Sequence, residues 1–280
     1  MFSKDSTKIM GIINTTPDSF SADGTKSDIS NSLKQAEEFI KYGADILDIG
    51  GESTRPGADF VDATEEINRT APIIKAIRTE FPNIDISIDT YKAPVAESAI
   101  ENGANIINDV WGGTMDEFIL KVAKDNDTPI CLMHNKSKPK DIEIDAKLGG
   151  SYNAPVYNDF IPDLLNELNE LANNAINAGV KKEKIILDPG VGFGKTTEQN
   201  MQIINNLDKI KSLGYPVLLG ASRKSFIGQA LDLDVGERLE GTMATSVIGA
   251  MYGVDIVRVH DVKENSRIVK MTTEILKTDR

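Results

Sequence analysis

Short apolar runs recur along the chain, and segments with a helical pattern separate them. The runs are rich in Ile, Val and Leu, and most of them do not alternate with polar residues. Strands that are buried on both faces of a parallel sheet have this composition. We therefore expect eight strands, which include residues 9–13, 46–49, 84–88, 106–107, 130–133, 185–187, 217–219 and 256–259.

The segments between these runs carry apolar residues at helical spacing, as Leu33, Ala36 and Ile40 show. Such stripes are typical of helices that pack on a core. Several of these segments end in a glycine shortly before the next apolar run, at Gly43, Gly103 and Gly253. A glycine just past a helix can take the left-handed conformation that ends it. Each of these units predicts a helix end followed by a strand.

About eight strand–helix units follow one another without an obvious linker. Eight such units in about 250 residues are typical of a (β/α)8 TIM barrel. We therefore expect an α/β protein in which residues 1–280 form a single TIM-barrel domain. A doubly wound sheet is the alternative, although it usually has fewer strands.

Polar residues stand at or near the end of all eight apolar runs. In a TIM barrel these ends share one face, and active sites are built there. Any one of these residues could instead cap the following helix. Polar groups at every end favour a functional site. The set includes both histidines of the protein and consists of Asn14, Asp48, Asp89, Asn108, Asp109, His134, Asp188, Ser222, Arg258 and His260.

Three polar, turn-rich loops follow strands on the same face. Residues 14–24 and 50–58 have the length and composition of binding loops or lids. Residues 135–157 are longer still and contain Gly149-Gly150, which favours an insertion or a mobile cover.

The segment from Asp188 to Thr196 is close to a nucleotide-binding Walker A motif, but Pro189 stands where that motif has its first glycine. A tight strand-to-helix turn that lines a pocket is the better interpretation. Thr196 and Gln199 have the spacing of a capping box for the next helix. We expect Lys195 to be a solvated surface lysine.

Charge and cysteine content narrow the classes of function. With Lys+Arg 31 and Asp+Glu 43, the 280-residue chain has a formal net charge of −12. This acidity argues against binding to nucleic acid or to a membrane surface through a basic patch. A single cysteine, Cys131, excludes an intrachain disulfide and favours a reducing, cytoplasmic compartment. We expect neither a signal peptide nor a membrane span.

Several ordered blocks of sequence match one family over roughly residues 8–275. The chain resembles the dihydropteroate synthases, and the number of blocks makes the match specific. The sequence departs from the usual family pattern at residues 21–24 and 135–137. These departures affect the expected structure of two loops and not the expected binding residues. The matching blocks are residues 14–21, 50–57, 87–90, 107–109, 132–134, 188–195, 222–228 and 258–262.

The resemblance implies a transferase that forms a C–N bond in folate biosynthesis. Such an enzyme joins 6-hydroxymethyl-7,8-dihydropterin diphosphate to 4-aminobenzoate and yields 7,8-dihydropteroate and diphosphate. Mg²⁺ assists the reaction, and the family usually forms homodimers. No nucleic acid or membrane is implied as a partner.

The resemblance also implies roles for individual residues around the pterin. A carboxylate can accept both donors of the guanidine-like pterin edge, and Asp188 would take that edge. Asp89 and Asn108 would hold other ring nitrogens, and Lys224 would donate to the ring carbonyl. Arg258 would face the ring and contact the anion, so that Asp188, Lys224, Asp89 and Arg258 form the catalytic set.

The remaining implied roles concern the other two ligands and the metal. Thr54, Arg55 and His260 would bind the diphosphate together with Arg258, and Asn14 would bind Mg²⁺. The aminobenzoate would lie among Phe193, Pro56, Lys224 and Ser225.

Two alternatives from other classes remain open at this point. A pterin-binding module without synthase activity would share the barrel, but it would not need the two loops at residues 14–24 and 50–58. A phosphosugar-metabolising barrel would carry a Gly-rich phosphate loop after the seventh or eighth strand. Here a basic segment, Arg223-Lys224, follows the seventh strand instead.

Overall fold

The structure is a computed structural model, and it describes residues 6–15, 25–53, 58–137, 142–145 and 149–278. Within these ranges, strands and helices alternate along almost the whole chain.

Eight parallel strands form one sheet in the order β8-β5-β4-β3-β2-β1-β10-β9. A parallel bridge between Leu187 and Val217 joins its two end strands, and the Leu187 amide donates to the Pro216 carbonyl at 2.9 Å. The sheet therefore closes into a barrel, which confirms the predicted TIM-barrel fold. Its strands are β1 (Lys8–Asn14), β2 (Ile46–Gly50), β3 (Asp85–Asp89), β4 (Ile106–Asp109), β5 (Ile130–Met133), β8 (Ile185–Asp188), β9 (Leu218–Leu219) and β10 (Ile256–Val259).

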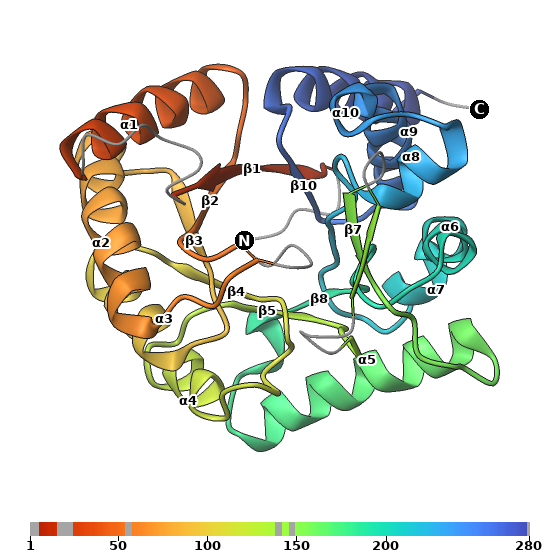
Figure 1. The fold of residues 1–280 in the computed structure, drawn as a ribbon, viewed down its shortest axis with the longest axis horizontal. Coiled ribbons are helices and arrows are strands. Elements are labelled where there is room, and N and C mark those ends of the chain that lie inside the picture. Colours follow the sequence, from red (N-terminus) through yellow and green to blue (C-terminus); the bar gives the residue numbers. More distant parts are fainter. Residues whose placement is uncertain (1–5, 16–24, 54–57, 138–141, 146–148, 279–280) are drawn as a thin grey trace.

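Helices surround the barrel on the outside (Figure 1). The predicted helix ends are confirmed, since Gly43, Gly103 and Gly253 have φ values of 93°, 113° and 70°. The helices are α1 (Thr25–Lys41), α2 (Ala63–Glu80), α3 (Ala93–Glu101), α4 (Phe118–Asp125), α5 (Phe160–Asn177), α6 (Thr197–Asn205), α7 (Leu207–Lys211), α8 (Ser225–Leu231), α9 (Leu239–Met251) and α10 (Val262–Leu276).

An apolar cluster fills the inside of the barrel below its carboxyl-terminal mouth. Seven of the eight barrel strands contribute one residue each, and every one of these side chains is buried. Because side chains alternate along a strand, the residues two positions further on also point inward, toward the mouth. The cluster consists of Met10, Ile46, Ile106, Cys131, Ile186, Leu218 and Ile256.

The long segment after β5 contains regular structure. Two short strands, β6 (Ile142–Asp145) and β7 (Gly149–Tyr152), pair antiparallel as a hairpin. The hairpin leaves the barrel between β5 and α5, and β7 packs against α8 (Figure 1). The inserted segment therefore reaches a helix that follows β9, two barrel strands away from β5.

Candidate membrane-spanning helices were sought in the described part of the chain, and none is both long and apolar enough to cross a bilayer.

The interior cluster leads to a first test of the fold. Ile46 is fully buried at the centre of the barrel, and truncation there leaves a cavity between strands. We expect Ile46→Ala to lower the free energy of unfolding by about 2–5 kcal/mol, measured by urea denaturation. Ile275→Ala, at a 56% exposed position on α10, is the control and should stay close to the parent. Equal stability of the two variants would contradict this account of the core.

Candidate functional site

Charged and amide side chains from opposite sides of the barrel meet at its mouth. Asp89 ends β3, Asn108 lies at the end of β4, and Arg258 comes from β10. The Arg258 Nη2 donates to Asp89 Oδ2 at 2.5 Å, and its Nε donates to Asp48 Oδ2 at 2.6 Å. Asn108 Nδ2 donates to the same Asp48 oxygen at 3.1 Å. Asp48 thus joins Asn108 to Arg258, and Arg258 in turn joins Asp89.

Asp188 and Lys224 form a second group of opposite charge at the same mouth. A Cβ atom at Gly220 would lie 3.6 Å from Asp188 Oδ2 and 4.0 Å from Lys224 Nζ, so both groups face this glycine. The Asp188 carboxylate accepts from the Gly190 amide at 2.7 Å. Lys224 Nζ donates to the Val191 carbonyl.

The Lys224 ammonium also lies 4.5 Å from the centroid of the Phe193 ring. A cation at this distance is attracted to the face of the ring. Ser225 is the first residue of α8, directly after Lys224. Both residues predicted to bind aminobenzoate are therefore next to Lys224. The Phe193 ring lies beside its ammonium, and Ser225 follows it in the chain.

Burial shifts the pKa values of these groups, and their neighbours oppose the shift. Burial raises the pKa of Asp188, and the nearby Lys224 ammonium lowers it. Burial lowers the pKa of Lys224 to about 8, against the effect of Asp188. Burial likewise raises the pKa of Asp89, and Arg258 opposes that shift. Each buried charge thus depends on an opposite charge beside it.

His260 and Asn14 lie at the ends of β10 and β1. The His260 Nδ1 and the Ser222 Oγ are 3.0 Å apart, which connects β10 to the segment that carries Lys224. A Cβ atom at Gly50 would lie 4.0 Å from Asn14 Oδ1 and 3.8 Å from Asp89 Oδ2. Asn14 is therefore close to the Asp89 end of the mouth.

Three predicted residues, Thr54, Arg55 and Pro56, lie outside the described residues. The same holds for most of the first predicted loop, residues 16–24.

The predicted tight turn after β8 is present, and it packs against the residue that follows β5 and against Lys224. Gly190 has a φ of 69°, and a Cβ atom there would lie 2.0 Å from the His134 carbonyl oxygen. Gly192 has a φ of 82°, and a Cβ atom there would lie 2.6 Å from Lys224 Cδ. The predicted capping box of Thr196 and Gln199 is present at the start of α6.

The prediction for Lys195 is wrong. Its side chain is buried, and its Nζ donates to the carbonyls of Phe193 at 3.0 Å and His134 at 3.1 Å. The turn folds back on itself, so the lysine points under the turn rather than into solvent. Lys195 thereby connects the Phe193 backbone to the end of β5.

Two polar clusters near the mouth were not predicted from the sequence. Lys92, before α3, pairs with both Glu52 and Glu66, and the Glu66 carboxylate is fully buried. His134 Nε2 lies 2.5 Å from Glu167 Oε2 of α5. The partners are separated by 26 to 40 residues along the chain, so no local motif could reveal them.

Among the described residues, no group of three or more His, Cys, Asp and Glu side chains could hold a metal ion. The Asn14 side chain carries an amide oxygen, which is a type of ligand that Mg²⁺ accepts.

Comparison with known proteins identifies the family. The family model for pterin binding enzymes matches residues 10–260. A dihydropteroate synthase of Clostridium beijerinckii is 55% identical over 272 residues, which cover 97% of this chain and 95% of that protein. The chain belongs to the dihydropteroate synthase family.

Solved structures of dihydropteroate synthases share the fold over nearly their whole length. The enzyme of Clostridium difficile, crystallised in the presence of pteroic acid, has a TM-score of 0.90 and 45% identity, and the match covers 99% of this chain and 100% of that chain. The Yersinia pestis enzyme in complex with a sulfonamide drug has a TM-score of 0.88 and 36% identity, with 99% and 96% covered.

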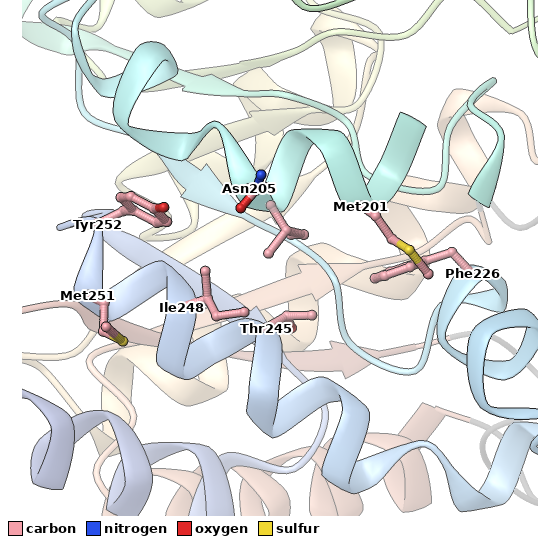
Figure 2. A pocket seen from close by; sticks show the side chains of 8 residues that line it. Met201, Asn205, Phe226, Thr245, Ile248, Met251 and Tyr252 are labelled. Carbon is pink, nitrogen blue, oxygen red and sulfur yellow. The ribbon is translucent and has the colours of Figure 1, made fainter. Parts of the chain in front are cut away.

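This member of the dihydropteroate synthase family also has an apolar groove on its outer wall (Figure 2). The groove has a volume of about 610 Å³ and lies between α6 and α9, with Phe226 of α8 at one end. No charged residue is among those that line it: Met201, Ile204, Asn205, Phe226, Thr245, Ile248, Met251 and Tyr252.

The burial of Lys195 predicts a specific pH dependence of stability. Burial lowers the pKa of Lys195 to about 7, compared with 10.5 for an ordinary lysine. Between these values the unfolded chain binds one more proton than the folded protein, so stability rises with pH by up to about 1.4 kcal/mol per pH unit. We expect Lys195→Met to lose this contribution when urea unfolding is measured between about pH 8 and 10.

Lys209→Met is the matched control, because Lys209 is exposed on α7. It should keep the parent slope of stability against pH. Parallel slopes for the parent and Lys195→Met would show that Lys195 is not buried as an ammonium with a lowered pKa.

Proposed function

We propose that the protein joins 6-hydroxymethyl-7,8-dihydropterin diphosphate to 4-aminobenzoate and releases 7,8-dihydropteroate and diphosphate. One observation carries this proposal. Two carboxylates, an amide, a guanidinium and an ammonium, from Asp89, Asp188, Asn108, Arg258 and Lys224, converge on one barrel mouth. Family membership and the pteroic acid in the Clostridium difficile crystal support the same assignment.

The pterin ring would lie among the acidic groups. The Asp188 carboxylate can accept the ring N–H and the exocyclic amine of the guanidine-like edge together. Asp89 and Asn108 would hold other ring nitrogens, and Lys224 would donate to the ring carbonyl. Because the mouth is largely buried, these hydrogen bonds are stronger than in water, and a ring with a different donor pattern would be rejected.

The diphosphate would lie toward the cationic groups. Arg258 and His260 are half-buried at the end of β10, and Thr54 and Arg55 from the β2 loop are part of the same proposal. Asn14 would bind Mg²⁺, which usually keeps several waters and binds through substrate phosphates. The ion would neutralise the charge that develops on the leaving diphosphate.

The reaction breaks the bond between the pterin methylene and the diphosphate oxygen, which leaves with the bonding electrons. The electron-rich ring can delocalise the cation, so a dissociative path is favoured. The carboxylates of Asp89 and Asp188 stabilise this cation, and Arg258 stabilises the departing anion. The amine of 4-aminobenzoate, held near Phe193, Lys224 and Ser225, then forms the C–N bond and loses a proton.

The proposal is tested by diphosphate release that depends on 4-aminobenzoate and Mg²⁺, with dihydropteroate identified as the product. We expect Asp188→Asn and Lys224→Ala to lower kcat/KM by about 100-fold or more, since each removes a charged hydrogen bond to the reacting ring. Circular dichroism would verify that both variants fold.

Lys209→Met serves again as a control and should turn over at the parent rate. A parent protein that binds pterin but releases no diphosphate would be a binding module, and this result would refute the synthase assignment. Parent rates in both site variants would refute the residue roles.

The homodimer is also part of this proposal, with the groove between α6 and α9 as the interface. Met201 and Met251 at this groove are 43% and 57% exposed. Since the chain has a formal net charge of −12, a groove lined by uncharged residues lets two copies meet there with little repulsion. We further propose a cytoplasmic location, which suits Cys131, a buried free thiol.

A charge in the groove should separate the two copies. We expect Met201→Glu to be a monomer by light scattering at concentrations where the parent is a dimer, because it buries a carboxylate without a partner. Phe118→Glu is the control, at a 60% exposed position on α4, and should remain dimeric. Dimers of all three proteins would exclude this groove as the interface.

A further inference from the structure

Asp48 is a buried carboxylate at the barrel mouth to which the proposed function assigns no role. It lies on β2, two residues after the interior residue Ile46, and therefore points into the barrel. Its side chain has no exposure to solvent. Burying a carboxylate in this way is costly unless it is paired and hydrogen-bonded.

Both partners of Asp48 belong to the proposed pterin site. Its Oδ2 accepts from Arg258 Nε at 2.6 Å and from Asn108 Nδ2 at 3.1 Å. These residues come from β10 and β4, which lie on either side of β2 in the barrel but do not adjoin it. One oxygen atom therefore ties together two residues that are 150 positions apart along the chain.

These bonds determine what each partner can offer to a ligand. With its Nδ2 donated to Asp48, Asn108 keeps its Oδ1 as an acceptor for a ring N–H. The Arg258 guanidinium is held from two directions, since its Nη2 donates to Asp89. A planar guanidinium with two fixed N–H groups has little rotational freedom left.

We propose that Asp48 is a positioning residue that selects the amide orientation of Asn108 and holds the Arg258 guanidinium before substrate binds. It would act entirely through these two side chains. The mouth would then be organised for a ring that donates toward Asn108, and little reorganisation would be needed on binding. This inference rests on the proposed function, because it assumes that the ligand is a pterin.

The test compares two kinds of substitution. Asp48→Ala removes the acceptor oxygen. Asp48→Asn can keep it, because the amide nitrogen would take the place of Oδ1, which has no hydrogen-bond partner among the described residues. We expect Asp48→Ala to raise the Kd for 6-hydroxymethylpterin at least about tenfold, and Asp48→Asn only about threefold, by calorimetry.

A double-mutant cycle shows whether Asp48 acts through its partner. In the Asp48→Ala background, Asn108→Ala should cost much less binding than in the parent, because its amide is no longer oriented. Ser87→Ala is the matched control, since Ser87 is buried and is the register partner of Asp48 on β3. Its Kd should equal that of the parent.

If Asp48→Ala does not fold, Asp48→Val replaces it in the cycle, because valine suits a buried strand and also lacks the acceptor. The proposal would be overturned if the variant without the acceptor oxygen bound the pterin with the parent Kd. It would also be overturned if the increases in Kd from the Asp48 and Asn108 substitutions were independent, so that the double variant showed their product. A separate synthase assay distinguishes the two ideas: a parent that binds the pterin but forms no dihydropteroate refutes the proposed function and leaves the Asp48 result decisive.

Discussion

Closure of eight parallel strands into a barrel is the constraint on which the rest of the structure depends. Because all strands run in one direction, their carboxyl ends meet at a single rim. The apolar cluster inside the barrel blocks the space below that rim and keeps water out. Polar side chains one step above the cluster, among them Asp48, Asn108 and Asp188, are therefore buried, and charges interact strongly where the effective dielectric constant is low.

At such a buried site, a charged side chain is stable only beside a side chain of opposite charge. Arg258 lies between Asp48 and Asp89, and Lys224 lies close to Asp188. Loss of one member leaves its partner buried without compensation, which costs more than the intact pair contributes. The arrangement therefore does more for selectivity than for stability, since a ligand must match the pattern of charge that is already present.

The fold was predictable from the sequence because strands buried on both faces are continuous apolar runs. All eight predicted runs became barrel strands. The runs predicted to begin at residues 84 and 217 each start one residue before their strands, which begin at Asp85 and Leu218. The same continuity conceals which side chains point inward. The sequence therefore placed Asp48 at the mouth without revealing that it contacts Arg258 and Asn108.

The prediction that Lys195 is solvated was wrong for a different reason. A lysine among glycines is usually solvated, and its burial depends on how the turn between β8 and α6 folds back toward β5. That path is determined by contacts with His134, which is 61 residues away along the chain. Neither composition nor periodicity contains such long-range information, and it appears only once the barrel has closed.

The turn after β8 also limits which amino-acid substitutions the mouth of the barrel can accept. At Gly190 a methyl group would collide with the His134 backbone carbonyl, and at Gly192 a φ of 82° disfavours any residue with a side chain. Substitution of either glycine would therefore strain the turn. Phe193 beside them does not have a positive φ, so its side chain could be replaced without a change in the path of the turn.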